Sequence, residues 1–202
     1  MSAKLVITAI EEHDVDQLAT MLAEGADPNR GLEEHPESLP LHAAVEEMTE
    51  GGTLEAVKLL LQHGAHPDGD PQGRSATPLL LAVMHGLNDA IEALLGAGAD
   101  PNFVSDEGAS PLRLAVEQKD IETAKTLLRF GATKSINDSG GPSGMNALGR
   151  AAYDLNIPMI ELLLAAQADP TALDLDHQTA RDRLPPRETN PEAWEKANKL
   201  LG

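Results

Sequence analysis

Histidines are the first residues in this chain whose side chains could hold a metal ion. The sequence has seven histidines and no cysteine, so any zinc site would need histidine and carboxylate ligands. His63 and His66 lie three residues apart, but the Gly64-Ala65 pair between them belongs to a predicted helix-ending turn. No third and fourth ligands accompany them in the sequence. We therefore expect two surface histidines and no metal site.

The carboxylates, 33 in number, show no pattern of a catalytic pair. Acid–base catalysis needs two groups whose surroundings separate their pKa values, and no two acids here are expected to be buried together. Serine is scarce and forms no evident arrangement with histidine and aspartate. The glycine-rich run at 140–144 lacks the lysine and the strand–loop–helix context of a phosphate-binding loop. We predict that the protein is not an enzyme and has no cofactor.

The charge of the chain is strongly negative and unevenly distributed. Of the net −18, residues 1–100 carry −14, from 18 acids against 4 bases, and residues 101–202 carry −4. Such a field repels nucleic acid phosphates and anionic lipid and attracts basic partners. We expect neither nucleic acid nor a membrane as a partner. The alternative is that the charge serves only solubility.

A short pattern recurs at the end of apolar helical segments. It reads Gly-Ala-Asp-Pro-Asn or a variant of it, at 25–29, 64–68 and 98–102, more faintly at 167–170, and without the acid and the proline at 131–133. The pattern returns every 33 to 39 residues. A period of this length predicts one structural unit stacked on itself.

The third copy shows the unit most clearly. Thr77 can cap a helix, and Pro78 fits the first helical position because its missing donor would be unpaired there anyway. This short helix should end near Gly86, and a second should begin around Asn88 and end at a left-handed Gly98. Each unit is therefore expected to be a pair of helices.

The Thr-Pro-Leu-His-x-Ala opening, the paired helices and the closing Gly-Ala-Asp together resemble the ankyrin repeat. The second copy carries the opening as Leu39-Pro40-Leu41-His42-Ala43-Ala44. The resemblance implies an all-α ankyrin-repeat solenoid of about six helix-turn-helix repeats with projecting hairpin loops. It implies a single domain over residues 1–202, with repeats at about 4–37, 38–75, 76–108, 109–144 and 145–177 and a C-terminal cap at 178–202.

The motif histidine survives only as His42. In the family this histidine helps to tie adjacent repeats together, so its loss elsewhere bears on local rigidity. The matching positions hold Ile7, Leu80, Arg113 and Gly149.

The second copy is also longer than the third. Pro40 to Gly52 is 12 positions, against 8 from Pro78 to Gly86. The segment 46–51 is expected to lengthen the first helix or to bulge from the turn. Such an insertion either serves binding or is a neutral variation in length.

By the family's geometry, the two residues after the Ala-Ala pair of each repeat face a concave groove. Six of these ten residues are acidic and none is basic: Glu11, Glu12, Glu46, Glu47, Met84, His85, Glu117, Gln118, Tyr153 and Asp154. Hairpin tips extend the strip, with Asp106 and Glu107 foremost and, beside them, Glu33, Glu34, His35, Asp70, Gln72, Arg74, Asn137, Asp138, Asp174, Asp176 and His177. The alternative is a solvated polar face.

We expect the protein to bind another protein that has a basic patch, with Met84, Tyr153 and Phe103 as anchors. One alternative, by analogy with small bacterial ankyrin proteins, is an inhibitor or immunity protein that neutralises a toxin or nuclease. Another is a structural adaptor that bridges two proteins. No signal peptide is visible and no stretch approaches the ~20 apolar residues of a membrane span. We therefore expect a soluble, cytoplasmic protein that is a monomer when free.

Overall fold

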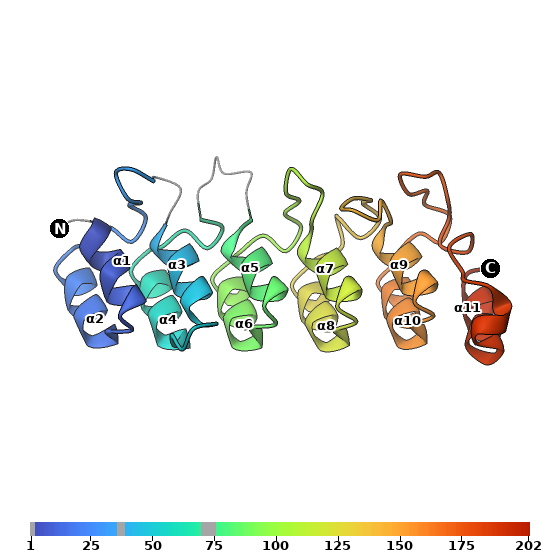
Figure 1. Cartoon of the computed structure of the whole chain (residues 1–202), viewed down its shortest axis with the longest axis horizontal. Helices are drawn as coiled ribbons and strands as arrows, with labels where there is room; N and C mark the ends of the chain where they lie inside the picture. Colours follow the sequence, from blue (N-terminus) through green and yellow to red (C-terminus); the bar gives the residue numbers. More distant parts are fainter. Residues whose placement is uncertain (1–2, 36–38, 70–75) are drawn as a thin grey trace. The chain divides into compact units, whose positions relative to one another are not determined.

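The structure is a computed structural model that describes residues 3–35, 39–69 and 76–202 (Figure 1). Over these residues it is all-helical, with eleven α-helices, one 3-10 helix and no strand, so the predicted all-α class is confirmed. The chain forms two compact units, unit 1 (residues 1–100) and unit 2 (residues 101–202). The single domain and the repeat boundaries stay predictions. Asp70, Gln72 and Arg74 of the predicted strip lie outside the described residues.

Unit 1 consists of three helix pairs. They are α1 (Ala3–Glu11) with α2 (Val15–Ala23), α3 (Pro40–Glu47) with α4 (Leu54–Gln62), and α5 (Pro78–Met84) with α6 (Asn88–Gly96). Within this unit α1, α3 and α5 pack side by side in one layer, and α2, α4 and α6 pack in a second (Figure 1). Small and aliphatic side chains let the layers approach closely, among them the fully buried Leu18, Leu41, Val57, Leu60, Leu79, Ala82 and Leu94.

Unit 2 has two such pairs and a terminal helix. The pairs are α7 (Pro111–Glu117) with α8 (Ile121–Arg129), and α9 (Ala147–Tyr153) with α10 (Ile157–Ala165). They are followed by η1 (Arg187–Thr189) and α11 (Pro191–Leu200). Helix α7 packs on α9, α8 on α10, and α11 on α10. The terminal helix therefore covers the last pair of unit 2.

The helices begin and end where the recurring pattern predicts. The Thr77 hydroxyl accepts a hydrogen bond from Leu80 N at 3.2 Å, and Pro78 occupies the first turn of α5. The Asn146 side chain caps α9 in the same way, accepting from Gly149 N at 2.7 Å. Gly98 has a φ of +96°, the predicted left-handed residue after α6.

The last residue of the pattern links successive helix pairs, a role that the sequence analysis did not assign to it. In unit 1 the Asn29 amide donates to Gly64 O and accepts from His66 N, both at 2.8 Å. In unit 2 the Asn102 amide donates to Gly131 O at 3.0 Å and accepts from Lys134 N at 2.9 Å. The pattern therefore ends one helix and ties its loop to the corresponding loop of the next pair.

The additional residues of the second pair bulge from its turn. Helix α3 has eight residues against seven in α5, and residues 48–51 form a turn before α4. The insertion therefore adds a longer turn after the acidic C-terminal end of α3.

Candidate functional site

Three exposed carboxylates gather at the ends of two packed helices of unit 1. Glu11 ends α1 and Glu12 follows it, while Glu46 lies in the last turn of α3. Helices α1 and α3 pack against each other. We call Glu11, Glu12 and Glu46 the acidic band.

The acidic band lies where helix electrostatics disfavour it. The C-terminal end of a helix carries a partial negative charge, and cations stabilise it while anions destabilise it, by about 0.3–1 kcal/mol each. In the described part of unit 1, no helix has a basic residue in its last turn. The helix ends therefore add to the negative potential of the band instead of offsetting it.

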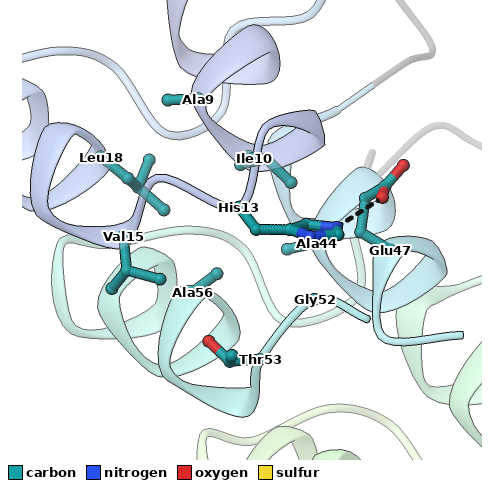
Figure 2. Close-up of a pocket in the computed structure, with 10 residues that line it drawn as sticks. All are labelled: Ala9, Ile10, His13, Val15, Leu18, Ala44, Glu47, Gly52, Thr53 and Ala56. Carbon is teal, nitrogen blue, oxygen red and sulfur yellow. Dashed lines mark hydrogen bonds and ion pairs between the residues drawn. The ribbon is translucent and has the colours of Figure 1, made fainter. Parts of the chain in front are cut away.

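Glu47, also predicted to contact a partner, is engaged within the chain. Its Oε2 lies 3.0 Å from His13 Nε2, and the two side chains are 25% and 33% exposed. Figure 2 shows the His13 ring pointing at Glu47 from the turn between α1 and α2. The backbone of His13 is left-handed, with a φ of +57°. Glu47 therefore ties two helix pairs together.

Asp154 of unit 2 makes the corresponding contact. Its carboxylate lies 3.3 Å from Lys119 Nζ and 2.8 Å from Arg150 Nε, and its side chain is 12% exposed. Lys119, like His13, occupies the turn of the preceding helix pair with a left-handed φ, +60°. The sequence signal was a basic residue in the turn followed 34 or 35 positions later by an acid, but neither residue is unusual alone.

Glu117 of unit 2 pairs with the buried Arg113. Arg113 stands at the position of the motif histidine and donates from Nε to Gly108 O at 3.2 Å. A Cβ added at Gly141 would lie 2.5 Å from the Arg113 guanidinium, so this loop rests directly against it. Loss of the motif histidine therefore removes no anchor here, because Arg113 holds both loops.

Most of the remaining candidates are exposed, while Phe103, the third predicted anchor, is half-buried. In unit 1, Met84 is 47% exposed at the end of α5, and His85 follows it. In unit 2, Tyr153 is 51% exposed at the end of α9, and Gln118, Asp106 and Glu107 also face solvent. These residues stay predicted contacts, each in its own unit.

Asp174 corrects the predicted strip, because it lies in an exposed hairpin but its own side chain is buried, whereas its neighbours Leu173 and Leu175 are exposed. Arg183 Nε donates to its Oδ2 at 2.5 Å, and the backbone N–H groups of Asp176 and Gln178 donate to its Oδ1 at 2.9 and 3.1 Å. Burial raises the pKa of Asp174, but these hydrogen bonds and the charge of Arg183 outweigh it, and the pKa falls below its ordinary 3.8. Asp174 therefore holds the hairpin's shape.

His63 and His66 are exposed, as predicted. Among the described residues, no three His, Cys, Asp or Glu side chains are grouped so that they could hold a metal ion. Nor does any helix in the described ranges have the length and apolar character needed to cross a bilayer.

Comparison with known proteins gives consistent matches. The family model described as ankyrin repeats (3 copies) matches residues 5–105 and 79–174. The ankyrin repeat protein FPV014 of Fowlpox virus is 36% identical over 129 residues, 63% of this chain and 28% of that protein. Human ankyrin repeat and SOCS box protein 10 is 37% identical over 93 residues, which are 46% of this chain and 19% of that protein. Neurogenic locus notch homolog protein 1 of zebrafish (Danio rerio) is 30% identical over 61% of this chain, which corresponds to 5% of that protein. The chain therefore spans between 5% and 28% of the length of these curated relatives.

Two solved structures share the fold at low identity. The crystal structure of EF0377, an ankyrin repeat protein, has a TM-score of 0.78 at 22% identity, covering 100% of this chain and 98% of that one. An ankyrin repeat domain (ABAYE2397) from Acinetobacter baumannii AYE has a TM-score of 0.79 at 23% identity, covering 97% and 95%.

Proposed function

The chain belongs to the ankyrin-repeat family, and on that premise we propose that it binds a basic protein through the acidic band of unit 1. Ankyrin repeats are generally protein–protein interaction modules, and their fold is typically not catalytic. The partner that we propose presents lysine and arginine side chains to Glu11, Glu12 and Glu46.

The observation that carries this proposal is the position of the acidic band. Three exposed carboxylates occupy the negative ends of two adjacent helices, with no basic residue in the last turn of either. A local arrangement that costs stability without a structural gain is typical of a functional surface. A basic partner supplies the missing cations.

The charge of unit 1 supports the same proposal. Unit 1 carries −14 of the net −18. Charge of this density accelerates the encounter with an oppositely charged partner and weakens with added salt. The acidic band then provides the short-range contacts.

The other candidates divide by their contacts. Glu47 and Asp154 form ion pairs that join neighbouring helix pairs, and Glu117 pairs with Arg113 of its own helix, so we propose that none of the three contacts the partner. Met84 and Tyr153 are exposed, and each offers an apolar contact from its own unit. Such side chains often contribute much of the energy of an interface.

The test compares two variants of equal charge. The band variant changes Glu11, Glu12 and Glu46 to lysine. The control variant changes three other exposed acids of unit 1 to lysine: Glu24 at the C-cap of α2, Glu55 of α4 and Glu92 of α6. The partner is first isolated by co-purification from the native cell at low salt and identified by mass spectrometry. Its affinity for each variant is then measured by calorimetry.

We expect the band variant to bind the partner at least about a hundredfold more weakly, a loss of about 2.8 kcal/mol of binding free energy. The control variant should lose much less. Equal losses would show that only net charge matters and would contradict the band as the contact surface. If the partner is an enzyme, assaying it in the complex separates an inhibitor from an adaptor.

A further inference from the structure

A groove opens along α1 of unit 1. It has a volume of about 390 Å³ and lies between the exposed side of α1 and the loop at residues 30–35. Lys4, Thr8 and Glu11 line it from α1, and Arg30, Leu32, Glu33, Glu34 and His35 line it from the loop. Of the acidic band, Glu11 lines this groove and Glu12 does not.

The groove combines an apolar floor with charged walls. Ala3 and Ile7, which also line it, are 6% and 5% exposed, and Leu32 is half-buried. Carboxylates enter from both sides, Glu11 from the helix and Glu33 and Glu34 from the loop. A long side chain with an aliphatic stem and a charged head matches this combination.

The charge of the groove changes along α1. Lys4 lies in the first turn and Glu11 at the end, seven residues or about 10 Å apart. The helix dipole has the same direction, with its negative end at Glu11. A cation is therefore favoured at the Glu11 end and disfavoured at the Lys4 end.

A guanidinium already meets a carboxylate at the wall. Arg30 Nη2 lies 3.7 Å from Glu33 Oε1, and both side chains are largely exposed, 56% and 89%. An exposed pair at this distance contributes little to stability. It can rearrange without much cost when a second cation enters.

We propose that this groove receives an arginine side chain of the basic partner, with its stem against Ile7 and Leu32 and its guanidinium at the carboxylate of Glu11. Arginine fits better than lysine because its guanidinium is more weakly hydrated and binds carboxylates with two parallel hydrogen bonds. The inference rests on the proposed function and adds to it the type of partner residue, an arginine, and the groove beside α1 that receives it.

The test uses a fluorescent peptide of alternating glycine and arginine, and a second peptide in which lysine replaces each arginine. Two matched pairs of variants are compared with the unmodified protein by fluorescence anisotropy at low and at physiological ionic strength. Glu11→Gln is paired with Glu24→Gln, which removes the same charge at the C-terminal end of α2, outside the groove and outside the acidic band. Thr8→Tyr, which fills the groove, is paired with Leu5→Tyr on the exposed side of the same helix.

We expect Glu11→Gln and Thr8→Tyr each to weaken binding of the arginine peptide at least about fivefold, and their partners less than about twofold. The arginine peptide should bind the unmodified protein more tightly than the lysine peptide. A fivefold loss for Glu11→Gln with Thr8→Tyr inert would overturn the groove while leaving the acidic band intact. Equal effects of Glu11→Gln and Glu24→Gln would overturn both. Failure of both peptides to bind the unmodified protein would overturn the basic partner and the groove together.

Discussion

His42 connects the second and third helix pairs of unit 1. Its Nε2 lies 3.1 Å from Ala76 O, 34 residues along the chain. The ring rests on Gly69, where an added Cβ would lie 2.1 Å from His42 Cε1. A glycine is therefore required at position 69 for two reasons: the His42 ring leaves no room for a side chain, and the backbone has a left-handed φ of +76°.

Gly69→Ala should destabilise the protein by about 2–3 kcal/mol. The left-handed backbone costs an alanine about 1–2 kcal/mol, and displacing the ring loses a hydrogen bond of about 1 kcal/mol. Gly64→Ala is the control, because Gly64 has a φ of +90° but no atom near its added Cβ, and it should cost only the backbone part. Urea unfolding followed by circular dichroism measures both, and equal losses would contradict the role of the ring.

Asp174 should make unit 2 sensitive to acid. Its pKa in the folded protein lies below the ordinary 3.8, so the ionised carboxylate stabilises the fold above that pH. This stabilisation is lost as the pH falls through the lowered pKa. At neutral pH Asp174→Asn should cost about 2 kcal/mol, because it removes one of the two carboxylates that pair with the largely buried Arg183, the other being Asp176.

The measurement is urea unfolding followed through Trp194, the one tryptophan of the chain, which lies in unit 2. The difference between the unmodified protein and Asp174→Asn should narrow below about pH 4. Asp138→Asn, at an exposed acid of the same unit, should show little difference at any pH. A gap for Asp174→Asn that stays constant down to pH 2 would argue against the ion pair.

At the scale of elements, acidic residues occupy both ends of unit 1 helices with opposite effects. Glu11, Glu12 and Glu46 lie at C-terminal ends, where the helix dipole disfavours them. The acids in the first turns of α2, α4 and α6 lie where the dipole favours them, and these are Asp16, Glu55 and Asp89. The two sets have equal charge and differ in position.

Neutralising the first set should therefore stabilise unit 1. Changing Glu11, Glu12 and Glu46 to glutamine should raise the unfolding free energy by about 1–2 kcal/mol in total at low salt. Changing Asp16, Glu55 and Asp89 to asparagine, glutamine and asparagine should lower it by a similar amount. Thermal unfolding measures the stability of both variants. If both are more stable than the unmodified protein, net charge and not the position of the acids on the helices determines the effect.

The sequence predicted the helix pairs because their signals are local. Thr77 and Pro78 start α5, and Gly98 follows the end of α6, whatever the rest of the chain does. The contacts between pairs were not predicted, because Asn29 and His13 meet partners that only stacking brings close. Asp174 was expected at a surface and is buried, because its hairpin brings the side chain onto Arg183 nine residues later.

The candidate site was predicted in part. Glu11, Glu12 and Glu46 face solvent as expected. Glu47, Glu117 and Asp154 form ion pairs with basic residues of their own or the preceding helix pair. Their position in the sequence, directly after the Ala-Ala motif, does not reveal these ion pairs. The groove beside α1 was not predicted, because it depends on where the loop at 30–35 lies.

Over the whole molecule, the charge is concentrated in unit 1, with −14 against −4 in unit 2. Unit 2 holds 11 of the 15 basic residues, and several of them pair with its own acids. The long-range attraction for a basic partner should therefore arise mainly from unit 1.

The most direct measurement is the association rate with the basic partner as a function of ionic strength, by stopped-flow. The unmodified protein is compared with the variant in which Glu11, Glu12 and Glu46 are changed to lysine. At low salt the unmodified protein should associate at least about tenfold faster, and the two rates should converge as salt shortens the Debye length below ~8 Å. Equal rates for the two proteins at low salt would contradict the acidic band as the surface that meets the partner.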